Sequence, residues 1–137
     1  MSANFTEVMQ KCVKAVQEAG DFQLKHFRTM PAGYGDEKDV REMVSFVDVE
    51  SEKILKAQLM PLVDGAGFYG EESGQEGSMD LTWVVDPLDG TTNYLSGVDH
   101  FSVSVALVEK GLPILALVLK PVSSDLWTCI KGEGLYY

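Results

Sequence analysis

Two aspartates stand three residues apart in the stretch WVVDPLDGTTNY, directly behind an apolar run. Pro87 disfavours a helical conformation for Asp86 and lacks the amide hydrogen that a continuing ladder uses, so Asp86 is expected where a strand ends. Asp89 precedes the small residues 90–92, and aspartate is a favoured N-cap residue. The spacing therefore predicts a strand that stops at one carboxylate and a short helix that begins at the other.

The amide groups at the start of such a helix could receive a phosphate oxygen. Two carboxylates beside a bound phosphate would repel it unless divalent cations lie between them, and hard oxygen ligands favour Mg²⁺, Ca²⁺ or Mn²⁺. The simpler alternative is that Asp86 and Asp89 only end a strand and cap a turn. An EF-hand does not fit, because Pro87 and Leu88 break the ligand alternation and Gly97 occupies the position of the twelfth-residue glutamate.

Other charged residues have both a structural and a functional interpretation. Glu71 and Glu72 follow a second short apolar run, as ordinary exposed loop carboxylates also do. Asp48 stands three residues after Ser45, which is the spacing of a capping box, so capping a helix is its simplest role. Lys38 lies in a glycine-rich segment, where a solvated surface charge is its simplest role.

The elements that must position these residues begin with two helices. Apolar residues at spacings of three and four predict an amphipathic helix over residues 4–27. A second helix is expected from Ser45 to Met60, ended by Pro61. The intervening residues 29–40 mix proline and glycine with charges, which predicts a mobile loop.

The remainder of the chain is predicted to form strands, at residues 68–72 and 81–86 and in a meander through residues 101–131. Within that meander, residues 112–120 are apolar on both faces, which is typical of a central strand, and a turn is expected at residues 121–124. Two helices on one face of an antiparallel sheet make an α+β fold, organised as a single domain over the whole chain.

Composition narrows the classes of function. The net charge is −10, with 21 acidic against 11 basic residues, which argues against nucleic-acid binding. The longest apolar run, residues 112–119, is shorter than the roughly 20 residues that span a bilayer. The N-terminus lacks the pattern of a secretory signal, so no membrane association and a cytoplasmic location are expected. Cys12 and Cys129 match no disulfide framework or zinc site and are expected to be reduced core thiols.

Taken together, the motifs resemble the inositol monophosphatase family. The stretch WVVDPLDGTTNYLS is similar to the family signature, GEES stands at the expected distance before it, and MVSFVDVESEKIL is similar to the family's aspartate-bearing segment. The resemblance covers nearly the whole chain and is closer to the inositol-phosphatase branch than to nucleotide phosphatases or fructose bisphosphatases. Because family members are about twice as long, the chain resembles the N-terminal half of their α/β sandwich, with the C-terminal half absent.

The resemblance implies a magnesium-dependent phosphomonoesterase that hydrolyses a small phosphorylated substrate, first of all inositol monophosphate, by a metal-activated water. Glu71, Asp86 and the backbone carbonyl of Leu88 would hold one Mg²⁺, and Asp86 and Asp89 would hold a second about 3.5–4 Å away. Glu71 would thereby serve catalysis as well as metal binding.

The resemblance also assigns the remaining site residues. Thr91 and Asp48 would orient the attacking water, while Gly90, Thr91 and Thr92 would cradle the phosphate. Lys38 resembles a family lysine near the site, although its distance from Asp48 along the chain fits only approximately.

Two alternatives to this reaction stay open. One is a metal-binding fragment or module without turnover, and the other is a phosphatase that acts on a sugar bisphosphate or a nucleotide phosphate. The family resemblance implies a homodimer. Without a second half, the second cation would lose a ligand and apolar surface would be exposed, which predicts association.

Overall fold

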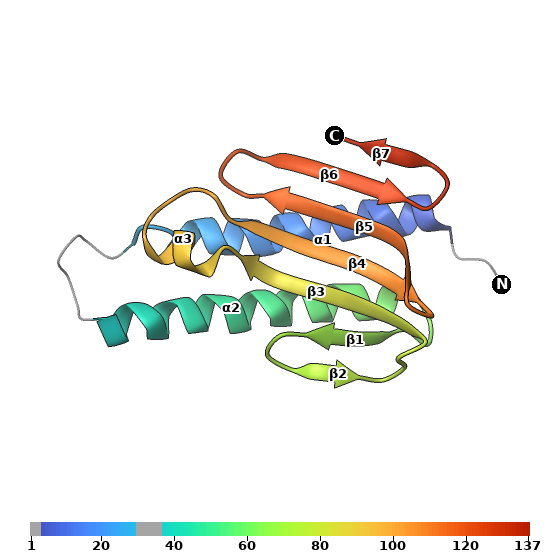
Figure 1. Ribbon diagram of the computed structural model, residues 1–137, viewed down its shortest axis with the longest axis horizontal. Helices are drawn as coiled ribbons and strands as arrows, with labels where there is room; N and C mark the ends of the chain where they lie inside the picture. Colours follow the sequence, from blue (N-terminus) through green and yellow to red (C-terminus); the bar gives the residue numbers. More distant parts are fainter. Residues whose placement is uncertain (1–3, 30–36) are drawn as a thin grey trace.

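A computed structural model describes residues 4–29 and 37–137 of the chain (Figure 1). Two long helices lie side by side and cover one face of a seven-stranded sheet, which confirms the α+β class. The helical elements are α1 (Phe5–His26), α2 (Glu37–Leu59), the 3₁₀ turn η1 (Met60–Leu62) and α3 (Thr91–Leu95). The strands are β1 (Gly67–Gly70), β2 (Gly74–Glu76), β3 (Leu81–Asp89), β4 (Ser102–Glu109), β5 (Leu112–Lys120), β6 (Asp125–Ile130) and β7 (Gly134–Tyr136).

The strand order is β2-β1-β3-β4-β5-β6-β7, so β5 lies inside the sheet as its apolar sequence predicts. Among the strands of the described residues, β1 and β3 run parallel while the other neighbouring pairs are antiparallel. The predicted antiparallel sheet is therefore confirmed except at this pair, which is parallel. The cause is the short hairpin partner β2, which occupies the outer edge of β1 and leaves β3 to pair with its inner edge in the same direction.

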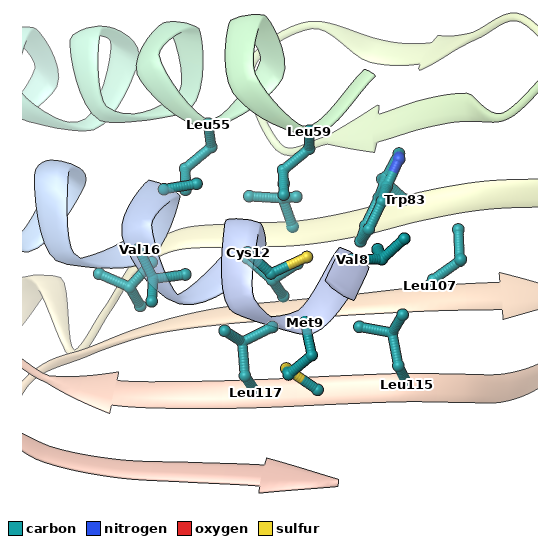
Figure 2. Close-up of a cluster of buried hydrophobic side chains, with 14 of the residues drawn as sticks. Val8, Met9, Cys12, Val16, Leu55, Leu59, Trp83, Leu107, Leu115 and Leu117 are labelled. Carbon is teal, nitrogen blue, oxygen red and sulfur yellow. The ribbon is translucent and has the colours of Figure 1, made fainter. Parts of the chain in front are cut away.

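Helix α1 confirms the predicted amphipathic helix. The side chain of Asn4 caps it by accepting a hydrogen bond from the amide of Glu7 at 3.2 Å. Figure 2 shows that its apolar face meets side chains from α2 and from strands β3, β4 and β5. The residues at this contact include Val8, Met9, Cys12, Val16, Leu55, Leu59, Trp83, Leu107, Leu115 and Leu117.

The two cysteines are free thiols, as expected, but Cys129 on β6 is only half-buried and is not a core residue. Cys12 is fully buried in the core, and this burial raises the pKa of its thiol to about 12. A thiol with so high a pKa is a poor nucleophile, so Cys12 is a packing residue.

Helix α2 begins at Glu37, well before the predicted start at Ser45. Residues 37–59 contain neither proline nor glycine, and the buried Val44 and Val47 extend its inner face towards the N-terminus. Ser45 therefore lies within the helix, and the capping-box interpretation of Asp48 is wrong. The loop predicted at residues 29–40 is helical from residue 37 onward, while its residues 30–36 lie outside the described ones.

Strand β3 continues past Pro87 to Asp89, although the sequence predicted that it would end at Asp86. Its register against β4 shifts between Asp86 and Asp89, and such an irregularity accommodates a proline that cannot donate to the ladder. The predicted strand at residues 68–72 ends instead at Gly70, which leaves the two following glutamates in a turn. The short strands β2 and β7 were not expected from the sequence pattern.

A second apolar cluster supports the end of β3. Its buried members are Val44 and Val47 from α2, Leu88 from β3, Tyr94 from α3 and Phe101. The rings of Tyr94 and Phe101 lie 5.0 Å apart in an edge-to-face arrangement. This cluster fixes the backbone that follows Asp86.

Residues at the last strand leave apolar side chains exposed. Leu135 is 69% and Tyr136 64% exposed on β7 at the edge of the sheet. This exposure is compatible with the predicted association of the chain, which stays a prediction. In the described part of the chain, no helix combines the length and apolar character that crossing a membrane requires.

Candidate active site and metal centre

The parallel pairing of β1 and β3 brings two acidic segments together. Gly70 lies opposite Val85 in this pair, and the carboxyl ends of parallel strands meet at the same edge of a sheet. Glu71 follows Gly70 and Asp86 follows Val85 in the sequence, so these two acidic residues lie next to each other. Helix α2, which packs against β3, contributes Asp48 to the same place.

Asp48 is the most perturbed carboxyl group of this site. It is only 9% exposed, and burial is the main cause that raises its pKa from 3.8 to about 7. The charges of Glu71, Glu72, Asp86 and then Glu52 raise it further. Its Oδ1 atom is buried without a hydrogen-bond partner. A buried carboxyl group that lacks a partner is costly to the fold, so it marks a candidate functional site.

Asp86 likewise has a raised pKa and a buried carboxyl oxygen without a hydrogen-bond partner. Burial raises its pKa first, followed by the charges of Asp89 and Glu71, while a hydrogen bond from the backbone amide of Leu88 lowers it. Its Oδ1 atom is also buried without a partner. Asp48 and Asp86 therefore each direct an unsatisfied oxygen into a region of strong negative charge.

The chemistry of these donors fits a hard divalent cation. Carboxylate and carbonyl oxygens are the ligands that Mg²⁺, Ca²⁺ and Mn²⁺ prefer. Across residues 4–29 and 37–137, no three acidic, histidine or cysteine side chains converge closely enough to hold a metal ion as they stand.

Asp89 does not cap α3, contrary to the sequence prediction. It is the exposed last residue of β3, and Gly90 occupies the N-cap position without any side-chain cap. Gly90 adopts a left-handed conformation with φ of 98°, which glycine tolerates and other residues rarely adopt. With five residues, α3 is too short for its N-terminus to define an anion site by itself. Phosphate binding at residues 90–92 therefore stays a prediction.

The backbone around Leu88 is held by a buried side chain and by a hydrogen bond from Thr91. The Leu88 side chain is buried in the second apolar cluster, and the hydroxyl of Thr91 donates to the Leu88 carbonyl at 3.3 Å. Thr91 is half-buried, whereas Thr92 is exposed. These contacts hold in place the segment that would present the Leu88 carbonyl and the Thr91 hydroxyl.

Lys38 lies in the first turn of α2 and not in a glycine-rich loop. Its side chain is 80% exposed, and its Nζ lies 4.0 Å from a carboxylate oxygen of Glu42. This is a surface ion pair one turn along the helix, of the kind that contributes little to stability. A role for Lys38 in the site stays a prediction.

Two polar residues that support the site were missed in the sequence. Gln23 is fully buried on the inner face of α1, and its Nε2 donates to the Pro87 carbonyl at 2.5 Å and to Ser51 Oγ at 3.2 Å. Glu52 is buried on α2, one helical turn after Asp48. The available signal was a polar residue in phase with an apolar helical face, such as Gln23 four residues after Ala19.

Substitution of Gly90 by alanine is expected to disturb the motif. An added Cβ would lie 2.8 Å from the His100 carbonyl oxygen, in a backbone conformation that already strains an L-residue. We expect a loss of about 1–3 kcal/mol in the free energy of unfolding, together with weaker Mg²⁺ binding. Urea unfolding and calorimetry measure the two effects.

Gly111→Ala is the matched control, because Gly111 also has a positive φ of 82° but a Cβ there meets no atom within 4 Å. It should cost less stability and leave Mg²⁺ binding unchanged. Equal effects from the two substitutions would show that the crowding at Gly90 is unimportant.

The fold and the site together define a class: a two-layer α+β protein whose carboxylates gather where the parallel pairing of β1 with β3 ends. The chain belongs to the inositol monophosphatase family, whose family model matches residues 4–137. This membership confirms the resemblance seen in the sequence motifs.

Two curated relatives illustrate the similarity. The "Nus factor SuhB" of Xylella fastidiosa is 38% identical over 122 residues, which cover 89% of this chain and 44% of the relative. The "Inositol-1-monophosphatase" of Rhizobium meliloti is 36% identical over 126 residues, which cover 90% of this chain and 47% of the relative. The chain thus spans about half the length of the curated relatives it matches.

Solved structures agree with this relationship. The extragenic suppressor protein SuhB from Bartonella henselae superposes with a TM-score of 0.81 at 31% identity, covering 95% of this chain and 50% of that one. The inositol monophosphatase from Anabaena has a TM-score of 0.77 at 24% identity, covers 98% of this chain and 48% of its own, and shows the shared fold.

Proposed function

We propose that this chain supplies the cation-binding part of a magnesium-dependent phosphatase that hydrolyses inositol monophosphate. The observation that carries the proposal is the pair of buried, unpartnered carboxyl oxygens on Asp48 and Asp86, each with a raised pKa, beside Glu71 at the end of β1. Family membership and the relative named inositol-1-monophosphatase support phosphatase chemistry.

Glu71, Asp86, Asp89 and the Leu88 carbonyl are the residues that would hold Mg²⁺. When bound there, the cations would supply Lewis-acid activation of the attacking water and neutralise charge on the departing oxygen. The mutual repulsion of the carboxylates is the reason that binding a cation at this place is favourable, because each added positive charge relieves it.

Asp48 and Thr91 would orient the attacking water, and of the two the Asp48 carboxylate would accept its proton. Asp48 is a buried carboxyl group of this site whose Oδ1 has no hydrogen-bond partner, so it can accept a hydrogen bond from that water. The Thr91 hydroxyl, which donates to the Leu88 carbonyl, keeps an oxygen lone pair free to accept from that water. Gly90 and the amides of Thr91 and Thr92 would contact the phosphate, and the alcohol is taken to be an inositol.

The proposal is tested with the 137-residue chain in two measurements. Calorimetry with Mg²⁺ tests cation binding, and phosphate release is compared among inositol 1-phosphate, fructose 1,6-bisphosphate and a nucleoside phosphate, with and without Mg²⁺. We expect Mg²⁺ binding and a preference for inositol 1-phosphate. A preference for either other substrate would reject the inositol assignment, and absence of Mg²⁺ binding would reject the site.

A second candidate is a protein that binds cations without turnover. The Xylella fastidiosa relative is named Nus factor SuhB and not as a phosphatase. Mg²⁺ binding without phosphate release from any of the three substrates would support this candidate only if release is also absent when the chain is joined to the second half of a relative, because the cation-binding part alone would give the same result.

A further inference from the structure

The carboxylate of Glu52 makes an unusual pair of contacts. Its Oε1 accepts a hydrogen bond from the backbone amide of Glu72, and its Oε2 accepts one from the amide of Ser73, both at 3.0 Å. Glu52 is only 4% exposed on α2, whereas the turn it contacts, residues 71–73, is exposed. One buried side chain of the helix therefore holds two successive amides of the turn between β1 and β2.

The end of β1 leaves space for this carboxylate. A Cβ added at Gly70 would overlap the carboxylate oxygen and carbon of Glu52. Gly70 has no positive φ, so backbone conformation is not the reason for glycine here. The close approach of the Glu52 side chain is a sufficient reason.

The contacts determine where Glu71 can lie. Glu71 stands between Gly70, which is fixed in the ladder opposite Val85, and the two amides that Glu52 holds. Hydrogen bonds to an ionised carboxylate are stronger than neutral ones, so the turn has little freedom to swing its Glu71 carboxylate away from Asp86.

The negative charge of Glu52 repels a neighbouring carboxylate of the site. Its negative charge is one of those that raise the pKa of Asp48. A turn could be capped without this cost by a neutral side chain. The placement of an acidic group here is better explained by a need for strong anchoring than by stability of the turn.

We propose that Glu52 is a positioning residue, which anchors the turn after β1 so that Glu71 faces the cation site. The role of the cation in this inference rests on the proposed function. The anchoring of the turn rests on the two observed hydrogen bonds. Both carboxylate oxygens of Glu52 accept hydrogen bonds from the backbone of the turn, so its observed contacts assign it to the turn.

The test uses the 137-residue chain with Glu52→Gln, in two separate readouts. Amide hydrogen exchange is measured by NMR without any cation, and Mg²⁺ affinity is measured by calorimetry. We expect protection of the Glu72 and Ser73 amides to fall about tenfold or more, because glutamine offers a single acceptor atom to two donors. Mg²⁺ affinity should fall about 10–100-fold, as is usual when a partner of a metal ligand is removed.

Glu50→Gln is the matched control. It removes the same charge from the same helix, but Glu50 contacts the exposed Lys53 at 3.3 Å and touches neither amide. It should leave both readouts unchanged. Gly70→Ala is a second route to the same effect, because it displaces the Glu52 carboxylate without removing it.

Unchanged exchange at both amides in Glu52→Gln and Gly70→Ala would overturn the anchor. Reduced protection with unchanged Mg²⁺ affinity would overturn the positioning role and leave Glu52 as a cap. Failure of the unsubstituted chain to bind Mg²⁺ would overturn the proposed function, while the exchange measurement, made without cation, would still decide whether Glu52 anchors the turn.

Discussion

Asp86→Asn is expected to abolish most of the Mg²⁺ affinity proposed for this chain. Asp86 is the residue that the family resemblance assigns to both cations, and its Oδ1 is buried without a partner. Since loss of a residue that merely supports a ligand costs 10–100-fold in affinity, we expect loss of this ligand to cost more than about 100-fold. Any phosphate release that depends on Mg²⁺ should disappear with it.

The same substitution should stabilise the chain when no cation is present. Burial and the charges of Asp89 and Glu71 raise the pKa of Asp86, so its ionised form is unfavourable in the folded state, and asparagine removes that charge. Calorimetry and the thermal midpoint without Mg²⁺ measure the two expectations. Retained Mg²⁺ affinity would exclude a ligand role for Asp86. Lost affinity together with a lower thermal midpoint would indicate that Asp86 has a structural role in place of a ligand role.

The second large effect concerns the pH dependence of stability without cation. The pKa of Asp48 is about 7 in the folded chain against 3.8 in its ordinary state. Between these values the folded state holds a proton that the unfolded chain has released. The free energy of unfolding therefore falls as the pH rises through this window, by at most about 4 kcal/mol. The contribution is fully present below the lower value and is lost above the higher one.

Urea unfolding at several pH values, followed by tryptophan fluorescence, to which the buried Trp83 contributes, measures this slope. Asp48→Asn should flatten it and make the chain more stable at neutral pH. Glu133→Gln removes one exposed charge from the turn before β7 and should leave the slope unchanged. A slope that is equally steep in Asp48→Asn would show that another group titrates.

Saturating Mg²⁺ should oppose this trend. Cations bind deprotonated carboxylates, so their binding strengthens as the pH rises and adds stability where the cation-free chain loses it. The same series of unfolding experiments in the presence of Mg²⁺ measures how the free energy of unfolding then depends on pH. Equal slopes with and without Mg²⁺ would mean that Asp48 does not lie near the bound cation.

Much of the fold could be predicted from local patterns. The spacing of apolar residues in α1 and the alternation in β4 each report which side of one element faces the core, and both were recognised correctly. Element ends were less reliable. Helix α2 was predicted to start late because the proline, glycines and charges of residues 29–40 indicated a loop, whereas the helix begins at Glu37.

The sequence by itself determined the kinds of chemistry available. The paired aspartates, the nearby glutamates and the excess of acidic residues indicate cations, and their order along the chain carries the resemblance to the family that the comparisons confirm. These features can be recognised in the sequence because they depend on residue types and short spacings.

The tertiary structure decided which of these groups act on one another. The parallel register of β1 with β3 sets Glu71 beside Asp86, burial against the sheet raises the pKa of Asp48, and the anchor from Glu52 reaches a turn twenty residues away. Strand pairing, burial and hydrogen bonds of this kind arise between segments that are distant in the chain, and no local pattern specifies them.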